Sequence, residues 1–161
     1  MSDPLATLTP SPMRRLFATG ALGALGVLTL WLLFANPPST VVLQAVLIAL
    51  GLLFLIMAMR LWAATARAVI LTKDGLFDTS GTTIATMDQI QSVDRGLFAF
   101  KPSNGFVAVT CKPLGRGWAP GLWWRVGRRI GIGGVTPASQ GKGMADMLAV
   151  ILAERAGPAG S

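Results

Sequence analysis

The sequence predicts a membrane α+β protein: a two-helix transmembrane hairpin followed by an antiparallel β-domain with a C-terminal amphipathic helix. Hydrophobic residues make up 52% of the 161 residues and charged residues only 13%, which is about half the charged content of an average soluble domain. No charged residue occurs from Leu16 to Met59. Beyond that stretch the pattern changes to short β-branched runs separated by glycine turns, and then to one helical period.

Composition narrows the range of functions. The net charge of +7 favours acidic partners such as anionic lipid. The single cysteine, Cys111, excludes an intrachain disulfide. Histidine is absent, which removes the usual metal ligand and the usual general base near neutral pH. We therefore predict that the protein is not an enzyme and uses no metal and no cofactor.

Two apolar blocks, residues 16–34 and 41–59, predict the two transmembrane helices. At about 1.5 Å per residue, each block is long enough for a bilayer core of ~30 Å. The turn sequence "ANPPST" separates them, and its two prolines cannot continue a helix. The predicted domains are a cytoplasmic tail over 1–15, the hairpin over 16–60, a cytoplasmic β-domain over 61–156 and a flexible tail over 157–161.

Basic residues predict the orientation of the hairpin. Arg14 and Arg15 precede the first span, Arg60 and Arg67 follow the second, and the loop between the spans carries no cation. The positive-inside rule then places both termini in the cytoplasm.

Small residues gather on the first predicted span. Gly20, Gly23, Ala24 and Gly26 would let another helix approach closely. The sequence leaves two partners open for this surface: the chain's own second span near Gly51, which is favoured, or a helix of another protein.

The β-domain is predicted as six or seven short strands. Strands are expected at Ala68–Thr72, Leu76–Thr79, Thr82–Thr86, Leu97–Phe100, Phe106–Lys112 and Arg129–Val135, while residues 87–93 form either a helical turn or a strand. Lys73-Asp74-Gly75 and Ser80-Gly81 are expected to be turns. The loop at residues 98–106 either packs in the core or serves as a recognition tip.

A helix over residues 137–156 closes the predicted domain. Thr136 is a suitable N-cap for it, with Pro137 at the first helical position. Apolar residues recur on one face of this helix, which must be buried against the sheet, and they are Met144, Met147, Leu148, Ile151 and Leu152. Gly157 is expected to end the helix.

The stretch "ILTKDGLFDTSGTTIATMDQIQSV", residues 70–93, resembles bacterial membrane-anchored PH-like proteins. Those proteins combine a two-helix hairpin, a small antiparallel barrel and a C-terminal helix, and the resemblance extends over about residues 16–156. It implies a PH-like β-barrel or sheet and a multi-pass location in the bacterial inner membrane. It implies no particular activity.

A basic and aromatic segment is the candidate binding site, and it contains no carboxylate. Its residues are Lys112, Arg116, Trp118, Trp123, Trp124, Arg125, Arg128 and Arg129. Indoles favour the membrane interface, and cations favour anionic lipid. The alternative is that some of the indoles pack in the core while the arginines are solvated. Prolines and glycines within the segment predict a loop or lip, and without a nucleic-acid-binding motif the sequence does not favour DNA or RNA.

The carboxylates of the domain show no spacing suited to acid–base catalysis, and Cys111 is expected to be a small buried hydrophobe. We therefore predict a non-enzymatic scaffold, or an accessory or assembly subunit, whose β-domain holds a protein partner at the membrane face. The expected partners are the bilayer and a membrane protein or a second copy of the chain. The alternative function is a binder or sensor of anionic lipid headgroups that uses the basic and aromatic segment.

Overall fold

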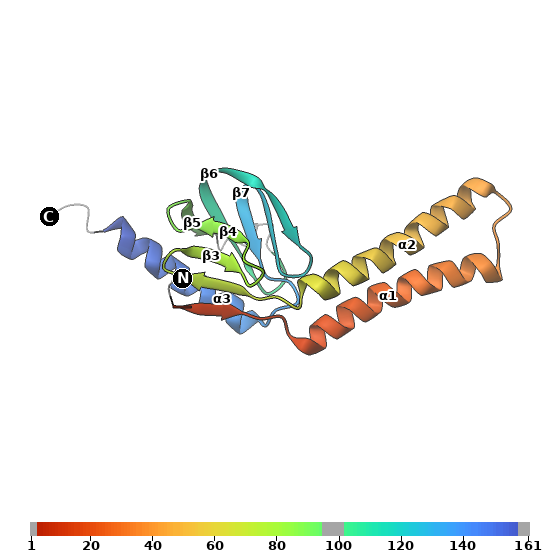
Figure 1. Cartoon of the computed structure of the whole chain (residues 1–161), viewed down its shortest axis with the longest axis horizontal. Coiled ribbons are helices and arrows are strands. Elements are labelled where there is room, and N and C mark those ends of the chain that lie inside the picture. Colours follow the sequence, from red (N-terminus) through yellow and green to blue (C-terminus); the bar gives the residue numbers. More distant parts are fainter. Residues whose placement is uncertain (1–2, 95–101, 158–161) are drawn as a thin grey trace. The chain divides into compact units, whose positions relative to one another are not determined.

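The computed structural model describes residues 3–94 and 102–157. The chain divides into two compact units (Figure 1), one made of Pro12–Ala63 and the other of the segments on either side of it. The first unit is a pair of helices, and the second is a β-domain with one helix. The β-domain is thus built from residues that precede and follow the helical pair.

Helices α1 (Pro12–Ala35) and α2 (Val41–Ala64) are each 24 residues long. Both are long and apolar enough to cross a membrane. They extend the predicted spans at both outer ends, because the apolar and helix-favouring sequence continues past the arginines. In the turn between the helices, the side-chain Nε2 of Gln44 donates a 2.7 Å hydrogen bond to the carbonyl oxygen of Pro38, so this amide has a structural role.

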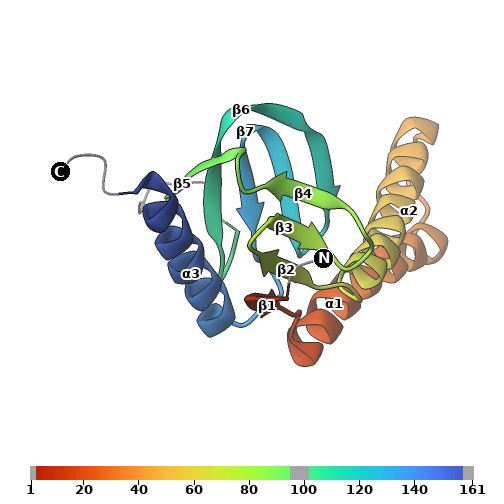
Figure 2. The same cartoon turned by 60° about the vertical axis from the view of Figure 1, so that its left-hand side comes forward.

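The β-domain contains two antiparallel sheets and a C-terminal helix (Figures 1 and 2). The first sheet has the order β1-β2-β3-β4, with β1 at Ala6–Leu8, β2 at Val69–Thr72, β3 at Gly75–Asp78 and β4 at Thr83–Thr86. The second has the order β5-β6-β7, with β5 at Ile90–Asp94, β6 at Phe106–Ala119 and β7 at Trp123–Ile132. Helix α3 covers Ala138–Ala156.

The prediction that residues 1–15 form a tail separate from the β-domain is wrong. Residues 6–8 form β1, which pairs with β2 in the register Ala6↔Leu71 and Leu8↔Val69, and α1 begins at Pro12. The side chain of Leu8 is completely buried in the core. Burial of this leucine and the ladder hydrogen bonds hold the segment in the sheet.

The tight turns follow the sequence prediction. Gly75, which closes the β2–β3 turn, has φ +151, and a Cβ atom there would collide with the backbone of Ala85. Gly81 has φ +86 in the β3–β4 turn, where the backbone N–H of Ser80 donates to the Asp78 carboxylate at 2.9 Å. Glycine is the residue that adopts these conformations without strain. Residues 90–94 resolve to strand β5, and the strand predicted at 97–100 lies outside the described residues.

Strands β6 and β7 form a long, bent hairpin (Figure 2). The prediction of a loop or lip over residues 112–129 is therefore wrong. Register shifts between Val109 and Gly117 take up the proline and the glycines, because a bulge bends a strand without ending its pairing. Beyond β7 the chain returns to the hairpin turn: Gly133 N–H donates to the Leu122 carbonyl at 2.8 Å and Val135 N–H to the Gly121 carbonyl at 3.0 Å.

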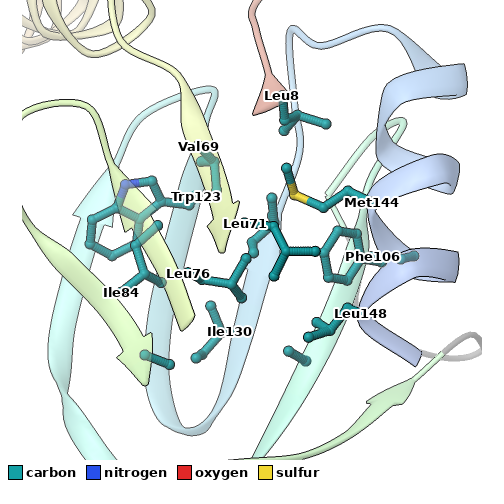
Figure 3. Close-up of a cluster of buried hydrophobic side chains, with 14 of the residues drawn as sticks. Leu8, Val69, Leu71, Leu76, Ile84, Phe106, Trp123, Ile130, Met144 and Leu148 are labelled. Carbon is teal, nitrogen blue, oxygen red and sulfur yellow. The ribbon is translucent and has the colours of Figure 1, made fainter. Parts of the chain in front are cut away.

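Both sheets and α3 contribute to one hydrophobic core (Figure 3). From α3, Met144 and Leu148 are fully buried, Ile151 and Leu152 are partly buried, and Met147 is 40% exposed. The predicted Thr136 N-cap is wrong, because Pro137 occupies the cap position and no side chain caps the helix. At the other end the prediction is confirmed, since Gly157 has φ +63 and donates its N–H to the Glu154 carbonyl.

Candidate functional site

The structure separates the eight residues of the basic and aromatic segment into two groups. Three of them make side-chain hydrogen bonds within the β-domain, namely Trp123, Arg125 and Arg128. The other five, which are Lys112, Arg116, Trp118, Trp124 and Arg129, keep exposed or half-exposed side chains.

Trp123 belongs to the core, which corrects its prediction as a surface residue. Its side chain is 5% exposed, and its indole lies within the buried cluster (Figure 3). The indole Nε1 donates a 3.0 Å hydrogen bond to Oδ2 of Asp78, whose side chain is fully buried. Arg67 approaches the same oxygen at 3.8 Å. A buried carboxylate requires such partners, and this requirement directs the indole inward.

Arg125 and Arg128 tie strands together. The guanidinium of Arg125 donates to the carbonyl oxygens of Gly115 and Ile84, each at 2.6 Å, and so joins β7 to β6 and to β4 of the other sheet. Arg128 donates to the Thr110 carbonyl at 2.8 Å and to the Gln91 amide oxygen at 2.9 Å. These contacts fix both guanidinium groups against the strands, although the side chain of Arg128 stays exposed.

A small apolar groove remains on the outer side of the hairpin beside its turn. Trp118 and Trp124 face each other across the two strands, and with Gly117 and Val126 they line a groove of about 360 Å³. Trp118 is 57% and Val126 54% exposed. We call Trp118, Trp124 and Val126 the tip face. The exposed cation Arg116 lies two residues before Trp118.

Val126 is a residue of the groove that was not predicted from the sequence. Alternation along β7 places Val126 on the side of Trp124, but this pattern is visible only once residues 123–126 are known to form a strand. Trp124 itself lies over Gly131, where an added Cβ would collide with the indole. Arg129 pairs with Val109 farther along the hairpin, and Lys112 lines a separate pocket with Asp88, so these two cations do not adjoin the groove.

The small residues of α1 have different surroundings. Gly26 packs against α2, because a Cβ on Gly26 would lie 2.8 Å from Leu55 Cγ and 3.0 Å from the Gly51 carbonyl oxygen. An added Cβ would meet nothing within 4 Å at either Gly20 or Gly23, and Ala24 is exposed. Of the four small residues, Gly26 is therefore the one that packs against the chain's own second helix near Gly51. Gly20, Gly23 and Ala24 are left for another partner.

The four arginines at the helix ends also differ. Arg14 and Arg60 are exposed. Arg15 joins the two helices at their shared end, since its Nη2 donates a 2.8 Å hydrogen bond to the Trp62 carbonyl and its guanidinium lies 3.8 Å from the centre of the Trp62 ring. This combination of a hydrogen bond and a cation–π contact stabilises the helical pair. Arg67 contacts Asp78 in the β-domain.

Chemistry-bearing groups are sparse in the described part of the chain. No three side chains of His, Cys, Asp or Glu among those residues gather as metal ligands. A hydrogen bond with the Thr86 side chain, helped by a backbone hydrogen bond, holds the pKa of the exposed Asp88 carboxyl below its ordinary value. Cys111 is exposed, so the prediction of a buried thiol is wrong; side chains alternate along β6, and Cys111 follows the buried Thr110.

The fold and the tip face together define a class: a β-domain that carries an apolar helical pair inserted between its first two strands. No family model, no curated protein and no solved structure matches this chain. A function is therefore inferred from the geometry of the two units.

Proposed function

We propose that the protein is a non-enzymatic scaffold, or an accessory or assembly subunit, of the bacterial inner membrane. Helices α1 and α2 cross the bilayer, and the β-domain holds a protein partner at its cytoplasmic face. Two antiparallel sheets with a C-terminal helix are compatible with the PH-like barrel that the resemblance implies.

Strand pairing supports the topology. β1 precedes α1, β2 follows α2, and the two strands pair with Leu8 opposite Val69. A sheet ladder cannot form across a bilayer, so both ends of the helical pair must lie on the same side. The arginines beside those ends, and their absence from the loop, favour the cytoplasmic side.

The open small-residue surface of α1 carries the proposal of a membrane-protein partner. Gly20 and Gly23 have free space where a side chain would be, and the hairpin's own packing uses Gly26 instead. In a membrane, close helix approach through glycine and alanine is a main source of association. A partner span, from another protein or from a second copy, fits the surface formed by Gly20, Gly23 and Ala24.

The test is the size of the complex on a native gel after mild detergent extraction. We expect the wild-type chain to migrate as a stable complex and Gly20→Leu to reduce that complex at least severalfold, because the added side chain blocks close approach. Ala45→Leu, a comparable enlargement at an exposed position of α2, should leave the complex intact. A wild-type chain that migrates as a monomer would rule out the partner, and an unaffected complex in Gly20→Leu would rule out this surface.

The alternative is a membrane-anchored binder or sensor of anionic headgroups. Its candidate site is the tip face with Arg116. A membrane-protein span docked on the small residues of α1 is compatible with either role of the β-domain, since the two contacts use different units of the chain.

A further inference from the structure

We propose that the tip face rests on the anionic headgroup layer of the same membrane that holds α1 and α2. The β-domain would then contact the bilayer directly in addition to its two covalent connections. The inference rests on the proposed membrane insertion of the helices, and it assigns a lipid surface to Trp118, Trp124 and Val126.

The first connection to the helices lies at the hairpin turn. Ser11, the last residue before α1, donates its backbone N–H to the Val135 carbonyl at 2.8 Å. Val135 in turn donates its N–H to the carbonyl of Gly121, in the turn between β6 and β7, at 3.0 Å. The chain that enters α1 therefore leaves the β-domain beside this turn.

The second connection lies at the same end of the β-domain. Arg67 follows α2 closely and contacts the carboxylate of Asp78 at 3.8 Å. The indole of Trp123, the first residue of β7, donates to the same carboxylate oxygen. Both connections thus adjoin the turn from which Trp118 and Trp124 project.

The connections are short. Only residues 9–11 separate β1 from α1, and only residues 65–68 separate α2 from β2. An extended residue spans at most about 3.5 Å, so this end of the domain stays close to the helix termini. The headgroup layer is therefore within reach of the tip face.

The chemistry of the tip face suits a headgroup layer. Indoles concentrate at the membrane interface because their rings are apolar and their N–H groups are polar. Val126 adds exposed apolar surface, and Arg116 adds an exposed cation. Strands β6 and β7 and their turn contain no carboxylate, so nothing in the hairpin repels an anionic lipid.

Spin-label accessibility in lipid nanodiscs tests the inference on the full chain. A nitroxide is placed at Val126→Cys in a Cys111→Ser background, and its collision rates with oxygen and with a water-soluble nickel chelate are compared. The native Cys111, exposed in β6 at a distance along the strand from the turn, is the control for a water-facing site. Leu28→Cys in the Cys111→Ser background, exposed on α1, is the control for a lipid-facing site.

We expect the ratio of oxygen to nickel accessibility for the label at position 126 to be several-fold higher than for the label at Cys111. The ratio at position 126 should fall when phosphatidylglycerol is replaced by phosphatidylcholine. A water-like ratio at 126 with a lipid-like ratio at 28 would overturn the inference and leave membrane insertion standing. Occlusion of 126 from both reagents would overturn it in favour of a protein contact. A water-like ratio at 28 would overturn the proposed insertion itself, and indifference to lipid charge would overturn the anionic preference.

Discussion

Replacing Leu8 with alanine is expected to destabilise the β-domain by about 2–5 kcal/mol, the usual range for truncating a buried leucine. Leu8 is completely buried in a core whose other fully buried large side chains come from residues after the second helix. Its strand, β1, is only three residues long, so the leucine side chain provides much of the energy that holds β1 in the sheet. Loss of that side chain also weakens the strand pair that joins the two ends of the helical unit.

Pulse proteolysis of the full chain in nanodiscs across a urea series measures this loss. Thr7→Ala is the matched control, because Thr7 is exposed on the same strand and should change the stability by less than about 0.5 kcal/mol. Equal urea midpoints for Leu8→Ala and the wild type would contradict the placement of β1. The same placement predicts that a fragment beginning at Arg60 lacks a strand of its domain.

Trp123→Ala is expected to cost at least about 3–5 kcal/mol, because it removes a large buried side chain. It also removes the indole donor from the buried Asp78 carboxylate, and an unsatisfied buried group adds about 1–3 kcal/mol. Trp123→Phe should recover part of the packing but not the hydrogen bond. Trp118→Ala, at a position 57% exposed, should leave the stability almost unchanged.

The same urea series distinguishes the two tryptophans. The expected order of destabilisation is Trp123→Ala, then Trp123→Phe, then Trp118→Ala. If Trp118→Ala destabilised the domain as much as Trp123→Ala, the separation of this segment into a core residue and a surface residue would be wrong.

Local sequence signals predicted the helical pair, the Gly75 and Gly81 turns and α3. Each of these depends on residues close together in the chain: an uninterrupted apolar stretch, a glycine with positive φ, or a helical period. β1 could not be predicted in this way. Its three residues have no pattern of their own, and the strand that they pair with, β2, begins only after both helices.

The sequence predicted which residues belong to the candidate site, but not that they lie on two paired strands or which of them are buried. Glycines and prolines between Lys112 and Arg129 suggested a loop, whereas bulges allow the strands to accommodate them. Which indole points inward depends on the distant Asp78 carboxylate. No local feature of the sequence therefore distinguishes the exposed Trp118 from the buried Trp123.

Membrane insertion of α1 and α2 with the β-domain in the cytoplasm is the central claim, and thiol labelling with a membrane-impermeant maleimide in spheroplasts tests it most directly. The exposed native Cys111 should react only after the membrane is permeabilised. Ser39→Cys in a Cys111→Ser background, exposed between the helices, should react in intact spheroplasts. Labelling of Cys111 in intact spheroplasts, or recovery of the chain in the aqueous fraction without detergent, would contradict the claim.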